Sequence, residues 1–217
     1  MSKRAVGKHG VSSKRPDYVK TMSPTYGGVS VSFDLLQAPV PERMYCPEYC
    51  DITESPNGNF LFLFSDFNAT TNKPNHTLIV TFSDIAMISF WHNSHRFLND
   101  LRAHAKKIYP DLKIDGEPNY QGGIATQSLA ANMMMMARSD GDVDISFYNF
   151  SPRSARLTAQ GRPSREEWVE PVVEIKATLR VALPMLVKVE KIVMGIADKN
   201  PELKSMLDAK MKLLEEI

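Results

Sequence analysis

Arginines crowd into a stretch of the chain that directly follows a group of aromatic residues. The aromatic residues are Phe147, Tyr148 and Phe150. Residues 151–165 then contain no acidic residue and four arginines, which are Arg153, Arg156, Arg162 and Arg165. Aromatic faces stack on bases of any sequence, and guanidinium groups hold phosphates. This combination predicts a surface for single-stranded nucleic acid, DNA or RNA, on which Tyr148 and Phe150 stack on bases and the arginines contact phosphates. A solvated loop is the alternative.

The N-terminal 20 residues carry a strong positive charge. Their basic side chains are Lys3, Arg4, Lys8, Lys14, Arg15 and Lys20, against the single acid Asp17, which gives a net charge of +5. Glycine, serine and proline are frequent there, and such a segment buries too little apolar surface to fold. We therefore expect a flexible basic arm over residues 1–24, in which Lys3, Arg4, Lys14 and Arg15 neutralise phosphates. A solvated tail is the alternative.

A second group of aromatic residues alternates along a short apolar run. Phe60, Phe62 and Phe64 follow the turn signal Asn57-Gly58. They could form another stacking platform, but the strict alternation does not fit the RNP1 pattern of RNA-binding strands. Core packing is the favoured interpretation.

Metal binding is a weaker hypothesis, based on Cys46 and Cys50 in a C-x3-C spacing and on His92 and His95 in an H-x2-H spacing. A structural zinc ion needs four such ligands, and zinc-binding histidine pairs usually have three to five residues between them, so H-x2-H is tighter than usual. Nothing in the sequence makes the two pairs meet. We therefore expect loop cysteines and solvent-facing histidines, with no bound metal and no cofactor.

The sequence favours a protein without catalytic activity. It contains no Gly-x-Ser-x-Gly elbow, no His-Glu-x-x-His, no Walker loop and no dinucleotide-binding glycine motif. The run Asp140-Gly141-Asp142 superficially suggests a calcium loop, but its glycine is misplaced for an EF-hand and no bidentate glutamate follows at the required distance. A hairpin turn explains that run.

Composition is that of a soluble globular protein. The chain has 217 residues, of which 43% are hydrophobic, with 26 Lys and Arg against 25 Asp and Glu. No apolar run approaches the roughly 18 residues that span a bilayer, so no membrane partner is expected. With two cysteines and no secretory signal pattern, an intracellular, cytoplasmic location is expected.

The first half of the chain should form strands followed by one long helix. Alternating residues predict a strand at 28–36, prolines predict an irregular loop between 39 and 56, and apolar runs predict strands at 59–64 and 78–82. Ser83 or Asp84 can then cap a helix that Pro110 stops.

The second half should repeat strands and then helix. Runs at 128–138 and 143–150 around Asp140-Gly141 predict a hairpin. The segment 165–197 fits either one long helix or a strand at 172–183 followed by a helix from 184 to 197. We favour the strand and helix, because a single helix would enclose both Pro171 and Pro184. A last amphipathic helix should follow Pro201.

The elements sum to an α+β protein with two groups of antiparallel strands, each followed by helix, and a helical C-terminus. Residues 25–217 should form one α+β domain, with sub-units at 25–112 and 113–217 as the alternative division.

The methionine run 133–136 and the apolar C-terminal helices favour a homo-oligomer. Together, these features predict a non-catalytic protein that binds single-stranded or packaged nucleic acid largely without sequence specificity. The alternative is an oligomeric structural or adaptor subunit of a larger assembly that does not contact nucleic acid.

Overall fold

The computed structural model describes most of the chain after residue 38. The described residues are 25–26, 29–30, 39–68, 70, 73–112, 124–138, 141–151, 153, 156–157, 160, 169–199, 201, 204–205 and 208. The basic arm at 1–24 lies outside them. So does most of the strand expected at 28–36, of which 29–30 belong to the short hairpin of β1 (Thr25–Tyr26) and β2 (Val29–Ser30).

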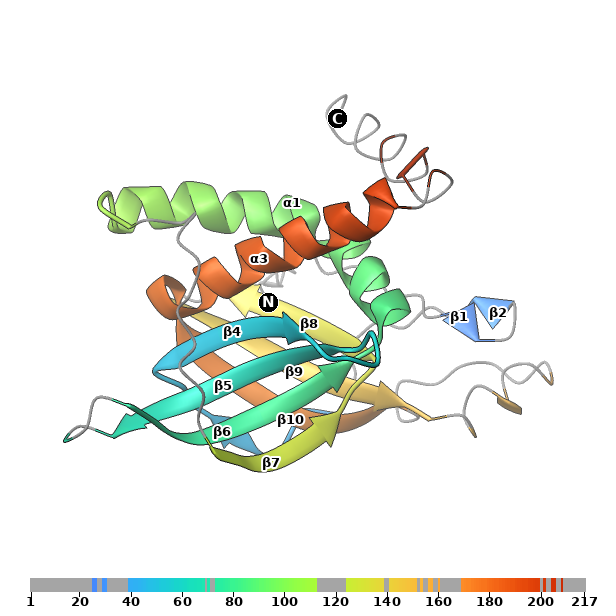
Figure 1. The fold of residues 1–217 in the computed structure, drawn as a ribbon, viewed down its shortest axis with the longest axis horizontal. Helices are drawn as coiled ribbons and strands as arrows, with labels where there is room; N and C mark the ends of the chain where they lie inside the picture. The colour runs from blue at the N-terminus through green and yellow to red at the C-terminus, as the bar shows by residue number, and fades with distance from the viewer. Residues whose placement is uncertain are drawn as a thin grey trace, which may run out of the picture.

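Two four-stranded sheets and two long helices make up the described fold (Figure 1). One sheet has the strand order β4-β5-β6-β7, with β4 (Tyr49–Glu54), β5 (Phe60–Asn68), β6 (Lys73–Phe82) and β7 (Ile124–Ala130). The other has the order β3-β10-β9-β8, with β3 (Met44–Tyr45), β8 (Met133–Arg138), β9 (Asp142–Phe150) and β10 (Val169–Thr178). The helices are α1 (Asp84–Ile108) and α3 (Leu179–Asp198).

The expected α+β class is confirmed, but the sheets are mixed rather than antiparallel. β7 pairs with β6 in parallel, and β3 pairs with β10 in parallel. Parallel neighbours need a long crossover between them, and α1 lies within the segment that connects β6 to β7. Each sheet also draws strands from distant parts of the chain, since β3 joins β8, β9 and β10.

The strand expected at 128–138 is in fact two strands in different sheets. The backbone N–H of Ala131 donates to the carbonyl of Thr81 on β6, whereas that of Asn132 donates to Tyr148 on β9, both at 3.0 Å. The chain therefore changes sheets between two consecutive residues. The hydropathy pattern alone does not reveal this change of sheet, because the residues of β7 and of β8 both have the pattern of a strand. The hairpin of β8 and β9 around Gly141 is as expected.

The irregular loop expected between 39 and 56 contains β3 and β4, so that expectation was wrong in part. Pro47 and Pro56 stand outside β4 and leave its six residues free to pair with β5. The Asn57-Gly58 turn joins the two strands, and Gly58 has a φ of 78°, which glycine adopts without strain.

The long helix α1 agrees with the sequence. Ser83 is its N-cap, and its hydroxyl accepts from the backbone N–H of Ala86 at 3.2 Å. The helix ends at Ile108, before Pro110.

Between residues 169 and 198 the chain forms a strand followed by a helix, as we favoured, and not one long helix. The expected boundary was wrong, because β10 ends at Thr178 and Pro184 lies inside α3. Pro171 lies within β10 next to a register shift, a position where the missing N–H is tolerated. Pro184 cannot donate to the carbonyl of Arg180, but the buried face of α3 compensates for that bond by packing. The last helix is described only at isolated residues from 201 to 208, which are helical.

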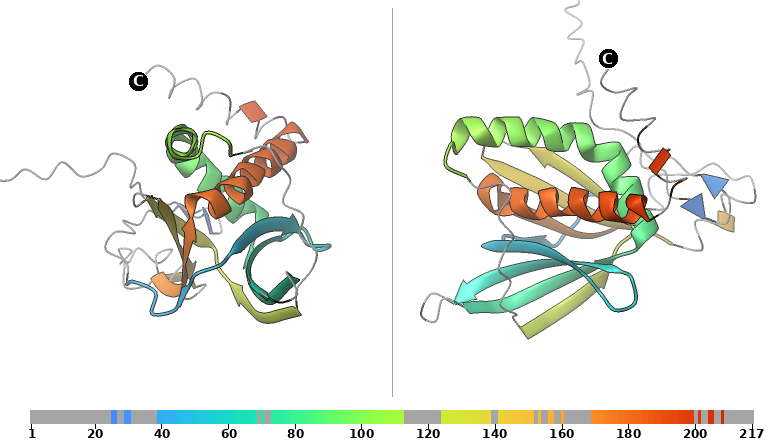
Figure 2. Two further views of the ribbon diagram at one scale, coloured as in Figure 1. Left: turned by 90° about the vertical axis from the view of Figure 1, so that its left-hand side faces the viewer. Right: turned by 45° about the horizontal axis from the view of Figure 1, so that its top comes forward.

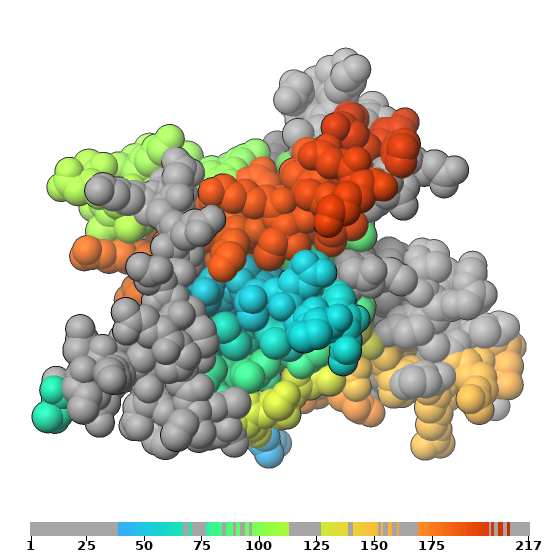
Figure 3. All heavy atoms as spheres, viewed as in Figure 1, coloured from blue at the N-terminus to red at the C-terminus, as the bar shows by residue number. Residues whose placement is uncertain are grey.

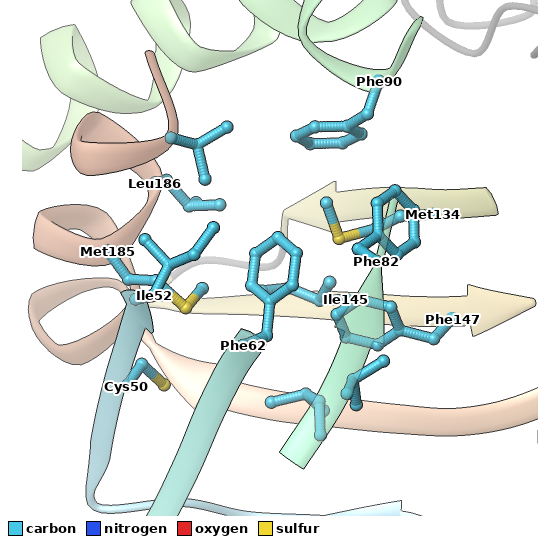
Figure 4. Close-up of a cluster of buried hydrophobic side chains, with 14 of the residues drawn as sticks. Cys50, Ile52, Phe62, Phe82, Phe90, Met134, Ile145, Phe147, Met185 and Leu186 are labelled. Carbon is cyan, nitrogen blue, oxygen red and sulfur yellow. The ribbon is translucent and has the colours of Figure 1, made fainter. Parts of the chain in front are cut away.

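The core lies between the sheets and under the helices. The ring of Phe147 on β9 has its centroid 5.4 Å from that of Phe62, 5.9 Å from Phe64 and 6.1 Å from Phe82. Met185 and Leu186 of α3 and Phe90 of α1 reach the same cluster (Figure 4). The side chains of Phe60, Phe62 and Phe64 are buried, so the core interpretation of these rings is confirmed.

The helices lie next to each other on the same side of the sheets (Figure 2). Arg102 of α1 forms an ion pair with Glu190 of α3. In the space-filling view the atoms of α3 lie against those of β4 (Figure 3), so the helix covers this edge strand.

Candidate nucleic-acid interface

The two aromatic residues predicted to stack on bases are in the core. Phe150 is fully buried and Tyr148 is 2% exposed. Burial raises the pKa of the Tyr148 hydroxyl, and the charge of Glu174 raises it further, while a hydrogen bond with Ser146 lowers it. The stacking role predicted for Tyr148 and Phe150 is therefore corrected, because both side chains are packed within the hydrophobic core and offer no free ring face to a base.

Two of the predicted arginines are on the surface. Arg153 and Arg156 are exposed and helical, and the N–H of Gln160 donates to the carbonyls of Arg156 and Leu157. Arg153 and Arg156 are only three positions apart in the chain, so their guanidinium groups can contact neighbouring phosphates of one ligand. Arg162 and Arg165 lie outside the described residues, as do Lys3, Arg4, Lys14 and Arg15.

The cysteine and histidine pairs do not form a metal site among the residues that the structure describes. Cys46 is exposed, whereas Cys50 on β4 is buried in the core. Burial, together with the charge of Asp51, raises the pKa of the Cys50 thiol well above its usual value and keeps it protonated. His95 lies against the ring of Trp91. Within the described part of the chain, no three potential ligands of the His, Cys, Asp and Glu types meet.

A group of basic side chains meets at the end of the fold where α1 stops. His104 and Lys107 are three residues apart in the last turns of α1 and so share a face. Together with Arg138, the last residue of β8, they line a cavity of about 340 Å³. Asp100 contributes the one acidic side chain among its lining residues, and Phe97 and Leu101 contribute a buried apolar wall.

Arg180 extends this group along the same end of the sheet. Arg138 on β8 pairs with Val143 on β9, which in turn pairs with Ala177 on β10. Strands lie about 4.8 Å apart, so Arg138 and Ala177 are separated by about 10 Å. Arg180 follows in the first turn of α3 and lines a second cavity, of about 600 Å³, with residues 108–112. We call His104, Lys107, Arg138 and Arg180 the cationic end.

The charged side chains of the described residues differ in whether they have a carboxylate partner. Lys188 forms an ion pair with Asp51, and Arg102 forms one with Glu190. Within the described ranges, neither Lys107 nor Arg138 has a carboxylate partner. Their charges are therefore available to an anion from solution.

Sequence reasoning missed the cationic end because its members are far apart in the chain. His104 and Lys107 belong to a helix, Arg138 ends a strand, and Arg180 begins another helix. The packing of α1 against β8 brings His104 and Lys107 to Arg138, and the register of β8, β9 and β10 places the start of α3 at the same end of the sheet. The one signal in the sequence was the pair of basic residues in the last turn of α1, which usually reflects the helix dipole.

Comparisons with protein-family models, with curated proteins and with solved structures found no match to this chain. Neither α1 nor any other helix in the described part of the chain combines the length and apolar character needed to cross a membrane. A functional assignment therefore depends on the residues and the geometry described above.

Proposed function

We propose that this protein binds single-stranded nucleic acid through its phosphates, largely without sequence specificity and without catalysing a reaction. The observation that carries the proposal is the exposed pair Arg153 and Arg156, three positions apart within an acid-free stretch. Arg162 and Arg165 belong to the same stretch, and the arm at 1–24 adds the charges of Lys3, Arg4, Lys14 and Arg15.

The burial of Tyr148 and Phe150 narrows the mode of binding. With no stacking from these rings, the free energy of binding comes mainly from phosphate contacts and counterion release. Such contacts position a strand but do not read its bases. Affinity should therefore depend steeply on salt and only weakly on sequence.

The test is a salt titration with a fluorescent oligo-dT and the full-length protein, followed by anisotropy. Each phosphate contact to a single strand contributes about 0.7 to the slope of log K against log salt. The double variant Arg153→Gln/Arg156→Gln should therefore reduce the slope by about 1.4. Deletion of residues 1–20 should reduce it further.

Lys191→Gln/Lys199→Gln is the matched control. It also removes two exposed positive charges, but from α3 and the residue that follows it rather than from the arginine stretch. It should leave the slope close to that of the wild type. No binding at about 50 mM salt, or equal slopes for the two double variants, would contradict the proposal.

A second candidate function is an oligomeric structural or adaptor subunit, which a different observation favours. Met44 is 61% exposed on β3, an edge strand of its sheet in the described fold, and Val40, in the segment that precedes β3, is 73% exposed. Exposed apolar groups at a sheet edge favour contact with another chain. Light scattering should then detect an oligomer that Met44→Lys dissociates, and a monomer at all concentrations would exclude this candidate.

A further inference from the structure

We infer that the cavity between α1 and β8 binds a phosphate group, held by Lys107 and Arg138 with His104 beside them. This site is separate from Arg153 and Arg156, because Arg138 lies level with Val143 at the start of β9, whereas the arginine pair follows the end of that strand. At about 3.3 Å per residue, the end of β9, from which the arginine pair follows, lies about 23 Å from Val143.

The lining residues supply the donors that a phosphate requires. The planar guanidinium of Arg138 can donate two parallel hydrogen bonds to two phosphate oxygens, and the ammonium of Lys107 adds a point charge with three donors. These groups approach the cavity from two different elements, so they can surround an anion rather than contact it from one side.

The charge and shape of the cavity favour an anion over a cation or an apolar ligand. Its lining contains two permanent cations and one acid, Asp100, so the net charge is positive whether or not His104 is protonated. The buried side chains of Phe97 and Leu101 form a wall that excludes water on one side, which strengthens the attraction between the cations and an anion. A volume of about 340 Å³ accommodates a phosphate together with part of an attached sugar.

The last turn of α1 opposes an anion slightly, because its carbonyl groups carry partial negative charge. The N–H of Tyr109 donates to the carbonyl of Ala105 at 2.7 Å and satisfies one of these groups. Lys106 and Lys107, both in the last turn, outweigh the remaining partial charge, which is equivalent to about half an elementary charge.

The inference deepens the proposed function and rests on it for the source of the phosphate. If the protein binds a single strand, the cavity takes a phosphodiester of that strand. The other source of the same chemistry is a free phosphomonoester such as a nucleotide. The experiment separates the two sources.

The experiment uses the full-length, ¹⁵N-labelled protein and follows the NMR signals of His104, Lys107 and Arg138. The probes are inorganic phosphate, a nucleoside monophosphate and an oligo-dT with a 5′-hydroxyl, with sodium chloride at matched ionic strength as the reference. We expect shifts that saturate with phosphate and not with chloride. Lys107→Gln and Arg138→Gln should each weaken this response about tenfold, as the loss of a charge-assisted hydrogen bond does.

Both side chains are exposed, so these substitutions remove charge without removing core contacts. Lys191→Gln, an exposed lysine on α3, is the matched control and should leave the response unchanged. Signals that no probe moves beyond the chloride reference, or a response that Lys107→Gln and Arg138→Gln leave intact, would overturn the inference. A response to the oligo-dT assigns the strand as the source, and a response to the monophosphates alone assigns a free phosphomonoester.

The design also separates this inference from the proposed function. If the oligo-dT binds through Arg153 and Arg156 while the signals of the cavity stay in place, the inference fails and the proposed function stands. If inorganic phosphate moves these signals while no oligonucleotide binds at low salt, the proposed function fails and the phosphate site stands.

Discussion

The side-chain amide of Asn132 pairs with both backbone polar groups of Phe150. Its Nδ2 donates to the Phe150 carbonyl at 2.9 Å, and its Oδ1 accepts from the Phe150 N–H at 2.8 Å. Asn132 stands at the corner between β7 and β8, and Phe150 ends β9. The amide thus takes the place of a neighbouring strand and fixes the point at which the chain passes from one sheet to the other.

Asn132→Ala should lower the free energy of unfolding by about 1–3 kcal/mol, because two backbone groups next to the core lose their partner. Urea denaturation measures this loss. Asn132→Asp is the control, since its carboxylate keeps the acceptor and loses the donor, and it should be destabilised as well. An Asn132→Ala variant as stable as the wild type would contradict the structural role of this pair.

Phe62 and Phe147 connect the two sheets, with ring centroids 5.4 Å apart at an angle of 63°. Phe62→Leu and Phe147→Leu should each destabilise the fold. The double variant should then lose less than the sum of the two, with a coupling of about 0.5–1.5 kcal/mol from the edge-to-face contact. Denaturation of the four proteins gives this coupling. Strictly additive losses would mean that the rings do not interact.

The two cysteines should differ in reactivity with a thiol reagent. Cys46 is exposed and Cys50 is buried with a raised thiol pKa, and only the thiolate reacts. Native protein should show one fast thiol, which Cys46→Ser removes, and one thiol that reacts only after unfolding. Two fast-reacting thiols in the native wild-type protein would be inconsistent with the packing of β4.

Stability should fall at alkaline pH partly because of Cys50. The unfolded thiol releases its proton above its ordinary pKa of about 8.5, whereas the folded thiol keeps it. Above about pH 8.5 the unfolded state therefore binds fewer protons than the folded state. The contribution of the Cys50 thiol to the free energy of unfolding is fully present below that pH and is lost as the pH rises, by up to about 1.4 kcal/mol per pH unit. Cys50→Ala should show a shallower decline above pH 8.5 in denaturation curves. Parallel declines for the two proteins would argue against it.

Lys188 of α3 holds a buried carboxylate on β4. Its Nζ lies 3.0 Å from Oδ1 of Asp51, which is buried and also accepts from the N–H of Ile52 at 2.7 Å. Lys188→Met should cost about 1–3 kcal/mol, less than a fully buried pair because Lys188 is partly exposed. The control Lys191→Met, on the exposed side of the same helix, should change stability little in the same urea titration. Equal stability of the two variants would show that the ion pair between Lys188 and Asp51 does not stabilise the fold.

Local signals in the sequence were enough for several elements and too weak for the rest. Ser83 and Pro110 bracket α1, and Asn57-Gly58 forms the turn that it predicts, because capping and turn geometry depend on neighbouring residues only. The corner at Asn132 was missed, since an apolar strand pattern does not reveal which sheet a residue joins. Arg153 and Arg156 are exposed, so their predicted contact with phosphates stays a prediction, whereas the stacking predicted for Tyr148 and Phe150 was wrong because both rings are buried.

The sequence by itself determined the α+β class, the long capped helix and the position of the acid-free arginine stretch, because each depends on composition and on spacing along the chain. The tertiary structure decided which aromatic faces are buried and which distant cations meet. Burial depends on what packs over a strand. The meeting of His104 and Lys107 with Arg138 depends on the packing of α1 against β8, and the place of Arg180 at the same end depends on the register of β8, β9 and β10. Neither is encoded in any short run of residues.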